Sequence, residues 1–209
     1  MARKPIAKPA APAPVARGRG EARARILEAA HAVMSERGYL SASVDEIATR
    51  AGISRPTFYA YFSDKIAVAF ALSENLEKET LRTYRKLAAL GPSPKFAELR
   101  DWVARRVAET RRRSSLIRIF GQVTAAEPGF YRITRGHRSA VFTMLGERIP
   151  AFGAAAATPK SIMAVRAHML LDQLELLCSM IALDWDGESD IAIDLMAEQI
   201  AHFIHLPGA

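Results

Sequence analysis

A short run between residues 54 and 65 concentrates the side chains with the clearest chemistry in this chain of 209 residues. Four of the five residues from Phe58 to Phe62 are aromatic, and Arg55 stands just ahead of them. A spacing of four places Phe58 and Phe62 on one helix face, which leaves Arg55 and Tyr59 together on another. A guanidinium beside phenols offers hydrogen bonds to phosphate oxygens and to base edges. We therefore expect the phenylalanines to pack inward and the polar groups to face a partner.

Two short helices joined by a tight turn would hold these side chains in place. Ser43 is a predicted N-cap for the first helix, and Glu46, three residues later, completes a capping box. Gly52 supplies the backbone conformation that the turn requires. Ser54 caps the second helix, and Pro56 is tolerated in its first turn because that position needs no N–H. The pattern indicates a helix-turn-helix.

The rest of the chain also has the pattern of helices. Ala, Leu, Arg and Glu are plentiful, and no alternating strand pattern competes. We predict an all-α fold of about nine helices, over residues 21–37, 44–51, 55–62, 64–90, 95–113, 115–125, 128–149, 160–184 and 188–205. Breaks are expected at Pro128-Gly129, from Pro150 to Pro159 and at residues 184–189. The domains would then be a disordered basic tail (1–20), a helix-turn-helix domain (21–65) and a larger helical domain (66–209).

Charge and composition narrow the classes of function. The formal net charge is +7 and the pI is about 9.8, which favours an anionic partner. Residues 167–209 hold 8 acidic residues and no Lys or Arg, so a nucleic acid should avoid them. The runs RRR (111–113) and RITRGHR (132–138) are expected to be solvated helix faces. No apolar run approaches the ~20 residues of a membrane helix, and a single cysteine, Cys178, allows no internal disulfide, so we expect a cytoplasmic protein.

The run SVDEIATRAGISRPTFYAYFSDKIAV resembles the N-terminal DNA-binding domain of the TetR (tetracycline-repressor-like) family, with a match from residue 21 to Lys65. The resemblance implies a homodimer that binds double-stranded operator DNA and a small-molecule effector. It gives Ser43 and Lys65 the role of phosphate contacts and makes Arg55 the best candidate for a base contact. The predicted DNA-binding residues are Ser43, Ser54, Arg55, Pro56, Thr57, Tyr59, Tyr61 and Lys65.

The larger domain would bind the effector and the second subunit. ISRPTFYAYF most resembles family members whose C-terminal pocket takes elongated hydrophobic ligands. In similar proteins the helices that line this pocket carry the positions of Trp102, Arg106, Phe120, Phe142, Met163, His168 and Asp172. His168 and Asp172 share a helix face and are able to pair, the alternative being a structural histidine. Helices 160–184 and 188–205 are rich in apolar residues on more than one side, which predicts a four-helix dimer interface or, alternatively, a monomer core.

The sequence thus predicts a ligand-responsive DNA-binding transcriptional regulator, a repressor that a small, largely hydrophobic inducer releases from its operator. A helical ligand-binding or adaptor protein of the same fold, without sequence-specific DNA binding, stays open as the alternative. An enzyme is not expected, because the chain has no Gly-rich phosphate loop, no HExxH, no CxxC and no nucleophile–base pair, and no cofactor or metal is implied.

Overall fold

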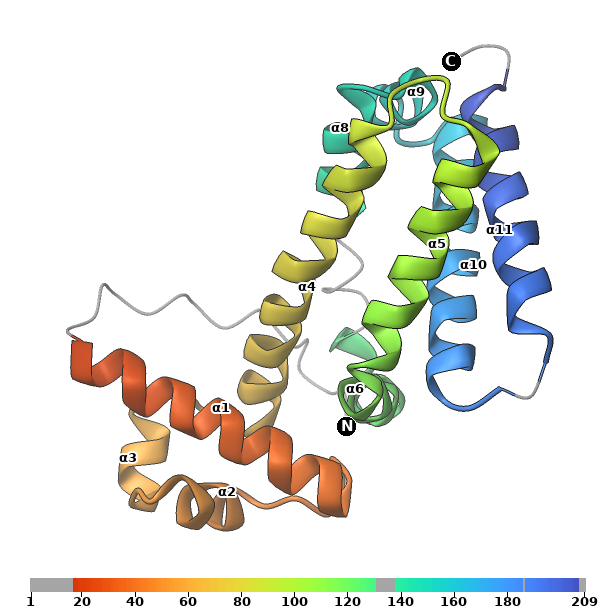
Figure 1. The fold of residues 1–209 in the computed structure, drawn as a ribbon. Helices are drawn as coiled ribbons and strands as arrows, with labels where there is room; N and C mark the ends of the chain where they lie inside the picture. The colour runs from red at the N-terminus through yellow and green to blue at the C-terminus, as the bar shows by residue number, and fades with distance from the viewer. Residues whose placement is uncertain (1–16, 131–137, 186, 207–209) are drawn as a thin grey trace. The chain divides into compact units, whose positions relative to one another are not determined.

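The computed structural model describes residues 17–130, 138–185 and 187–206, and these residues form helices and no strand, which confirms the all-α prediction (Figure 1). The helices are α1 (Arg17–Arg37), α2 (Val44–Ala51), α3 (Arg55–Tyr59), α4 (Lys65–Ala89), α5 (Phe96–Arg111), α6 (Ser114–Ala126), α8 (Arg138–Gly146), α9 (Pro150–Ala157), α10 (Ile162–Ala182) and α11 (Ser189–Ile204). The predicted tail lies outside the described residues up to residue 16, and α1 begins at Arg17, inside the segment expected to be disordered. None of the described helices has the length and apolarity needed to cross a membrane.

The chain divides into two compact units. Unit 1 comprises residues 1–77 and 115–135, and unit 2 comprises residues 78–114 and 136–209. The division falls inside α4, a continuous helix of 25 residues that contributes to both units. Unit 1 therefore extends past the helix-turn-helix: it includes the first half of α4 and nearly all of α6.

Unit 1 is held together by an apolar cluster around α2 and α3. The cluster contains residues from α1, α2, α3, α4 and α6, with Ile26, Ile47, Phe58 and Val68 fully buried. The side-chain oxygen of Gln122 on α6 accepts a hydrogen bond from the backbone N–H of Tyr39 at 2.6 Å. This bond satisfies a backbone donor just after α1 ends, and so α6 fixes the loop that leads into α2.

Unit 2 is built on α5, which packs against both α10 and α11. Its cluster includes Trp102, whose indole N–H donates to the carbonyl of Thr83 at 2.9 Å. Because a buried indole donor needs an acceptor, this bond joins the second half of α4 to α5.

The segment from Pro150 to Pro159 was predicted to be a break, and that prediction is wrong. Residues 150–157 form α9, with Pro150 in its first turn, where a missing N–H costs nothing. A Cβ added at Gly146 would lie 2.5 Å from the Cα of Gly153, so these two glycines let α8 and α9 approach closely. This contact with α8 stabilises a helix of alanines and glycine that local sequence signals alone do not predict.

Candidate nucleic-acid interface

The capping box predicted for α2 is present. The Ser43 hydroxyl oxygen accepts from the backbone N–H of Glu46 at 3.2 Å, and the Glu46 carboxylate accepts from the Ser43 N–H at 3.1 Å. The Ser43 hydroxyl also donates to that carboxylate at 2.9 Å. These bonds from Ser43, together with the charges of Arg37 and Arg50, hold the pKa of Glu46 below its usual value. The start of α2 is therefore fixed by its own side chains.

The turn between α2 and α3 depends on Gly52. Its φ of 65° and ψ of 39° lie in the left-handed region, and its N–H donates to the carbonyls of Ala48 and Thr49. No heavy atom lies within 4 Å of the place that a Cβ would take, so the backbone angle alone demands glycine here. After the turn, the Ser54 hydroxyl accepts from the N–H of Thr57 at 3.2 Å and so caps α3.

The side chains of α3 divide as the sequence predicts. Phe58 is 0% exposed and Phe62 is also buried, with their ring centroids 6.0 Å apart in the unit 1 cluster. Tyr59 is 45% exposed, and Arg55 is exposed beside it. The short helix thus turns its phenyl rings toward the protein and a guanidinium and a phenol away from it.

Arg55 is held in a defined position at this surface. Its Nη1 donates to Asp45 on α2 at 3.0 Å, and its Nη2 lies 3.4 Å from the hydroxyl of Tyr59. The guanidinium also lies over the Tyr59 ring, 5.7 Å from its centroid. The hydrogen bond to Tyr59 and the charge of Asp45 raise the pKa of Arg55. The arginine therefore carries its charge into any contact with a partner, and Asp45 orients it.

Tyr61 departs from the predicted surface. It is half-buried and packs against the unit 1 cluster. A separation of six residues places Tyr61 about 120° around the helix from Arg55, so the two side chains do not share a face. Helix α3 itself ends at Tyr59, and the N–H of Tyr61 donates to the carbonyl of Phe58 at 2.9 Å.

Lys65, the first residue of α4, is engaged by the protein itself. Its Nζ lies 2.8 Å from the carbonyl oxygen of Tyr39, 3.0 Å from that of Leu40 and 3.2 Å from that of Ala42. The ammonium also lies 4.6 Å from the centroid of the Tyr39 ring. An ammonium has three hydrogens, so these carbonyls satisfy all of them. Lys65 closes the loop between α1 and α2 in this structure.

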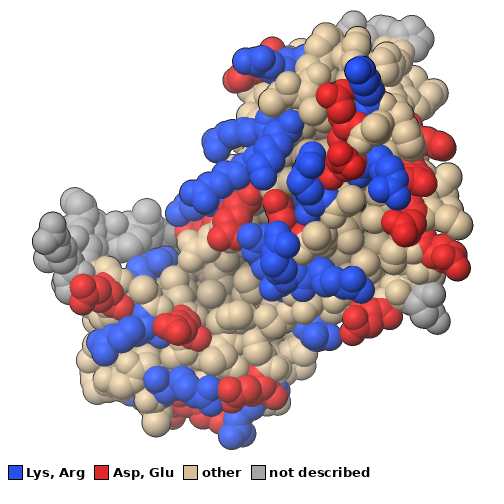
Figure 2. All heavy atoms as spheres, in the orientation of Figure 1, with Lys and Arg blue, Asp and Glu red and all other residues tan. Residues whose placement is uncertain are grey.

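Exposed basic side chains gather elsewhere as well. Figure 2 shows Lys and Arg concentrated over α4 and α5 of unit 2, whereas both signs of charge alternate over α1 to α3. The exposed basic residues of this part of unit 2 are Lys78, Arg82, Arg85, Lys86, Lys95, Arg105, Arg111 and Arg112. Arg111 and Arg112 thus match the solvated face predicted for the run RRR, while Arg113 is half-buried and pairs with Glu79.

The residues predicted to bind the effector are brought together only in part. Trp102 and Phe142 are buried in the unit 2 cluster, Met163 packs against it, and Arg106 is a buried charged residue of the same unit. The ring of His168 contacts Phe142 edge-on, with centroids 4.8 Å apart. Phe120 belongs to unit 1: it is on α6 and packs against the unit 1 cluster, with its ring centroid 5.8 Å from that of Phe130.

Arg138 was not among the predicted site residues, because its run was expected to be a solvated helix face. Its side chain is buried, its Nη1 donates to Asp172 at 2.6 Å, and its Nη2 donates to Glu175. Nη1 also approaches the carbonyl of His168 at 3.3 Å. The solvated-face prediction is wrong for Arg138, because two carboxylates on α10 compensate the buried charge. The other residues of the run, 132–137, lie outside the described residues.

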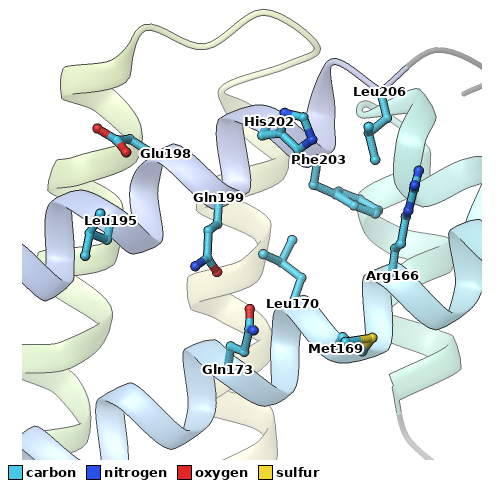
Figure 3. Close-up of a pocket in the computed structure, with 10 residues that line it drawn as sticks. All are labelled: Arg166, Met169, Leu170, Gln173, Leu195, Glu198, Gln199, His202, Phe203 and Leu206. Atoms are coloured by element: carbon cyan, nitrogen blue, oxygen red, sulfur yellow. The ribbon is translucent and has the colours of Figure 1, made fainter.

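A groove of about 450 Å³ lies between α10 and α11 (Figure 3). None of the predicted effector-binding residues lines it. Its lining residues are Arg166, Met169, Leu170, Gln173, Leu195, Glu198, Gln199, His202, Phe203 and Leu206. Met169 and Leu195 are among the exposed apolar residues of α10 and α11. The groove therefore lies on the outer face of these two helices, where apolar side chains stand beside polar ones such as Arg166 and Glu198.

Comparison with known proteins relates the helix-turn-helix to one family. The family of bacterial regulatory proteins described as the tetR family matches residues 26–72. The HTH-type transcriptional regulator YvdT of Bacillus subtilis is 47% identical over 57 residues, which are 27% of this chain and 29% of that protein. The HTH-type transcriptional activator FasR of Mycolicibacterium smegmatis is 46% identical over 54 residues, 26% of this chain and 25% of that protein. The chain thus matches less than a third of the length of these relatives.

Solved structures extend the likeness of fold to most of the chain. Thermus thermophilus FadR, a transcriptional repressor solved in complex with lauroyl-CoA, has a TM-score of 0.60 at 22% identity and covers 90% of this chain and 100% of that one. Salmonella enterica GusR has a TM-score of 0.64 at 19% identity and covers 88% of this chain and 96% of that one. At identities of 22% and 19%, these comparisons show that the fold is similar and nothing more.

Proposed function

We propose that this chain, a member of the tetR family of bacterial regulatory proteins, is a DNA-binding transcriptional regulator that responds to a small-molecule ligand. The observation that carries the proposal is the division of side chains on α3. Phe58 is buried, whereas Arg55 and Tyr59 are exposed and joined to each other. A helix that anchors itself with phenyl rings and presents a guanidinium and a phenol suits the major groove of a duplex.

The proposed contacts follow from the positions of the side chains. Arg55 pairs with a guanine, because its planar fork matches the two acceptors of that base. Tyr59 contacts the backbone beside it, and Ser54, Pro56 and Thr57 line the first turn of α3. Ser43 approaches a phosphate at the start of α2, where backbone N–H groups point outward. Lys65 contributes by holding the loop ahead of Ser43, through the three carbonyls that it binds.

The proposed partner of unit 2 is a second copy of the chain. Exposed apolar side chains gather on α10, on its C-cap residue and on α11, namely Ile162, Val165, Met169, Leu176, Leu183, Ile191 and Leu195. Two helices from each copy would cover these side chains in a four-helix interface. Such a dimer would carry two recognition helices about 34–36 Å apart, the separation of successive major grooves on one side of the duplex.

Induction is proposed to act by a shift of population. A small, largely hydrophobic inducer bound in unit 2 would favour a separation of the recognition helices that no longer fits the operator. The lever is α4, because this one helix contributes to both units. A coupling of about 1–3 kcal/mol would weaken DNA binding about 5- to 150-fold. The lauroyl-CoA in the T. thermophilus FadR complex supports a ligand with a long apolar chain for this fold.

Repression in the cytoplasm is the proposed mode of action, although the similar FasR of M. smegmatis is named an activator. Fluorescence anisotropy with a duplex from upstream of the chain's own gene, compared with a scrambled duplex, tests DNA binding. We expect a preference of about 10³-fold or more and a steep loss of affinity with salt. Equal affinity for both duplexes would contradict the proposal, and a reporter assay distinguishes repression from activation.

A further inference from the structure

One arginine of unit 2 is buried with no anion beside it in the part of the chain that the structure describes. Arg106 on α5 is 8% exposed, and its Nη1 donates to the hydroxyl of Thr110 at 2.6 Å. That hydroxyl in turn donates to the backbone carbonyl of Arg106 at 3.0 Å. Its buried Nε has no hydrogen-bond acceptor, and no carboxylate among the described residues pairs with the guanidinium. Burying a guanidinium away from water costs free energy, unless a paired anion or another hydrogen-bond acceptor compensates its charge.

A second unpaired donor lies close by. Tyr84 on α4 is 1% exposed, and its ring lies 5.7 Å from that of Trp102. Its hydroxyl has no hydrogen-bond partner within the described parts of the chain. Burial and the charge of Glu175 raise the pKa of Tyr84, whereas the charge of Arg106 lowers it. The same pattern holds at Cys178 on α10, where burial raises the pKa to about 11 against the charge of Arg106. Trp102, whose ring contacts that of Tyr84, stands one helical turn before Arg106 on α5, so Tyr84 and Arg106 belong to one region of unit 2.

Arg138 provides an internal comparison. It is buried to the same degree as Arg106, but it donates to two carboxylates, those of Asp172 and Glu175. Those two carboxylates are partly exposed and already engaged by Arg138. The same unit thus holds one arginine with its anions in place and one without. Buried polar groups in native proteins are usually satisfied, and an orphaned donor calls for a reason.

We propose that Arg106 and Tyr84 form a head-group subsite for a carboxylate, and that the effector of this regulator is an amphiphilic monocarboxylate. The N–H of Arg106 and the O–H of Tyr84 would each bind one carboxylate oxygen. The apolar part of the ligand would lie among the surrounding side chains, which include Trp102, Val103 and Leu174. This subsite deepens the proposed function, since it rests on unit 2 being the ligand-binding part of the regulator.

The test uses the full chain and decanoate as the probe, measured by isothermal titration calorimetry near neutral pH. Decyltrimethylammonium, which has the same chain and a positive head, is the matched ligand. We expect decanoate to bind and the cation to be rejected, because Arg106 repels it. Arg106→Met should weaken decanoate binding about 10- to 100-fold, and Tyr84→Phe should weaken it about 5-fold.

Thermal unfolding separates this role from a structural one. Tyr84→Phe removes a hydroxyl that has no partner, so it should not lower the melting temperature of the ligand-free protein. Tyr39→Phe, at the buried tyrosine of unit 1, is the control that should leave decanoate binding unchanged. The proposal is overturned if decanoate fails to bind at about 1 mM, if the cation binds as well as decanoate, or if both variants keep wild-type affinity.

The outcome is separable from that of the proposed function. DNA binding is measured on the ligand-free protein, with no dependence on decanoate. If the chain binds decanoate through Arg106 but shows no preference for its own upstream DNA, the subsite is supported and the proposed regulator is contradicted. If the chain prefers this DNA but binds no decanoate, the proposed regulator is supported and the subsite is contradicted.

Discussion

The outer face of α3 and the outer face of α10 and α11 are both exposed, and they differ in chemistry. On α3 the exposed groups are a guanidinium and a phenol, which Asp45 and a mutual contact hold in position. On α10 and α11 they are mainly aliphatic side chains, around a groove that Arg166 and Glu198 also line. Exposure alone does not identify a partner. The first face suits a polyanion, and the second suits another apolar protein surface.

The largest expected effect comes from a charge placed on the apolar face. Leu176, which is 61% exposed on α10, becomes buried in the proposed dimer, so Leu176→Glu should yield monomers. Losing the second half-site contact should weaken operator binding by about 100-fold or more. Light scattering after gel filtration measures the oligomeric state. Leu40→Glu is the control, because Leu40 is 69% exposed in unit 1 and its replacement should leave the mass unchanged.

Loss of the guanidinium on α3 comes next. Arg55→Ala should weaken binding to the operator about 5- to 150-fold and relax the preference at one base position. Arg55→Lys keeps the charge but loses the planar fork, so it should retain the salt dependence and lose the preference. Arg85→Ala, at an exposed arginine of unit 2, is the matched control. Anisotropy titrations with single-base operator variants provide the measurement. If Arg55→Ala kept the wild-type preference at every base position, Arg55 would not contact a base.

A substitution in the turn between α2 and α3 should have a smaller effect, and that effect is on stability. Gly52→Ala forces a side chain into the left-handed region and should cost about 1 kcal/mol of unfolding free energy. A loss of this size lowers the melting temperature by about 2–4 °C in a chain of this length. Gly121→Ala, in α6 with no atom near its added Cβ, should instead raise stability by up to about 1 kcal/mol. Equal effects of the two substitutions would argue against a role for the backbone angle.

The smallest expected effect is a dependence of stability on pH. The folded-state pKa of Glu46 lies below its usual value of 4.5, so its contribution is present above that value and is lost as the pH falls through the folded pKa. Between about pH 6 and about pH 3, the wild type should therefore lose more melting temperature than Glu46→Gln, which cannot titrate. Identical slopes for both proteins would contradict the predicted contribution of this carboxylate.

The parts of the molecule that the sequence predicted well are those with local signals. The capping box of Ser43 and Glu46, the left-handed Gly52 and the spacing of Phe58 and Phe62 all lie within 20 residues of one another. The failures depend on distant partners. Arg138 is buried because of carboxylates 34 and 37 residues away, and α9 forms where Gly153 meets Gly146. Neither contact could be predicted from the residue types that surround it in the sequence.

Lys65 and Arg106 illustrate the same limit within the candidate sites. The type and position of Lys65 suggest a phosphate contact, yet three carbonyls between residues 39 and 42 occupy its hydrogens. The sequence placed Arg106 among the predicted effector-binding residues because of its position on a helix. The proposed carboxylate subsite depends instead on its unsatisfied Nε and on the unsatisfied hydroxyl of Tyr84, which lies on another helix. A sequence gives the donors, and only the packed structure identifies which of them remain unsatisfied.

The most direct test of the central claim is to capture genomic DNA fragments with the purified full-length protein and to sequence them. We predict one recurrent palindromic motif, with half-sites about one helical turn or a multiple of it apart, because two α3 helices read the two halves. Recovery of fragments without a shared motif would mean that α3 does not read sequence, and the proposed regulator would be wrong.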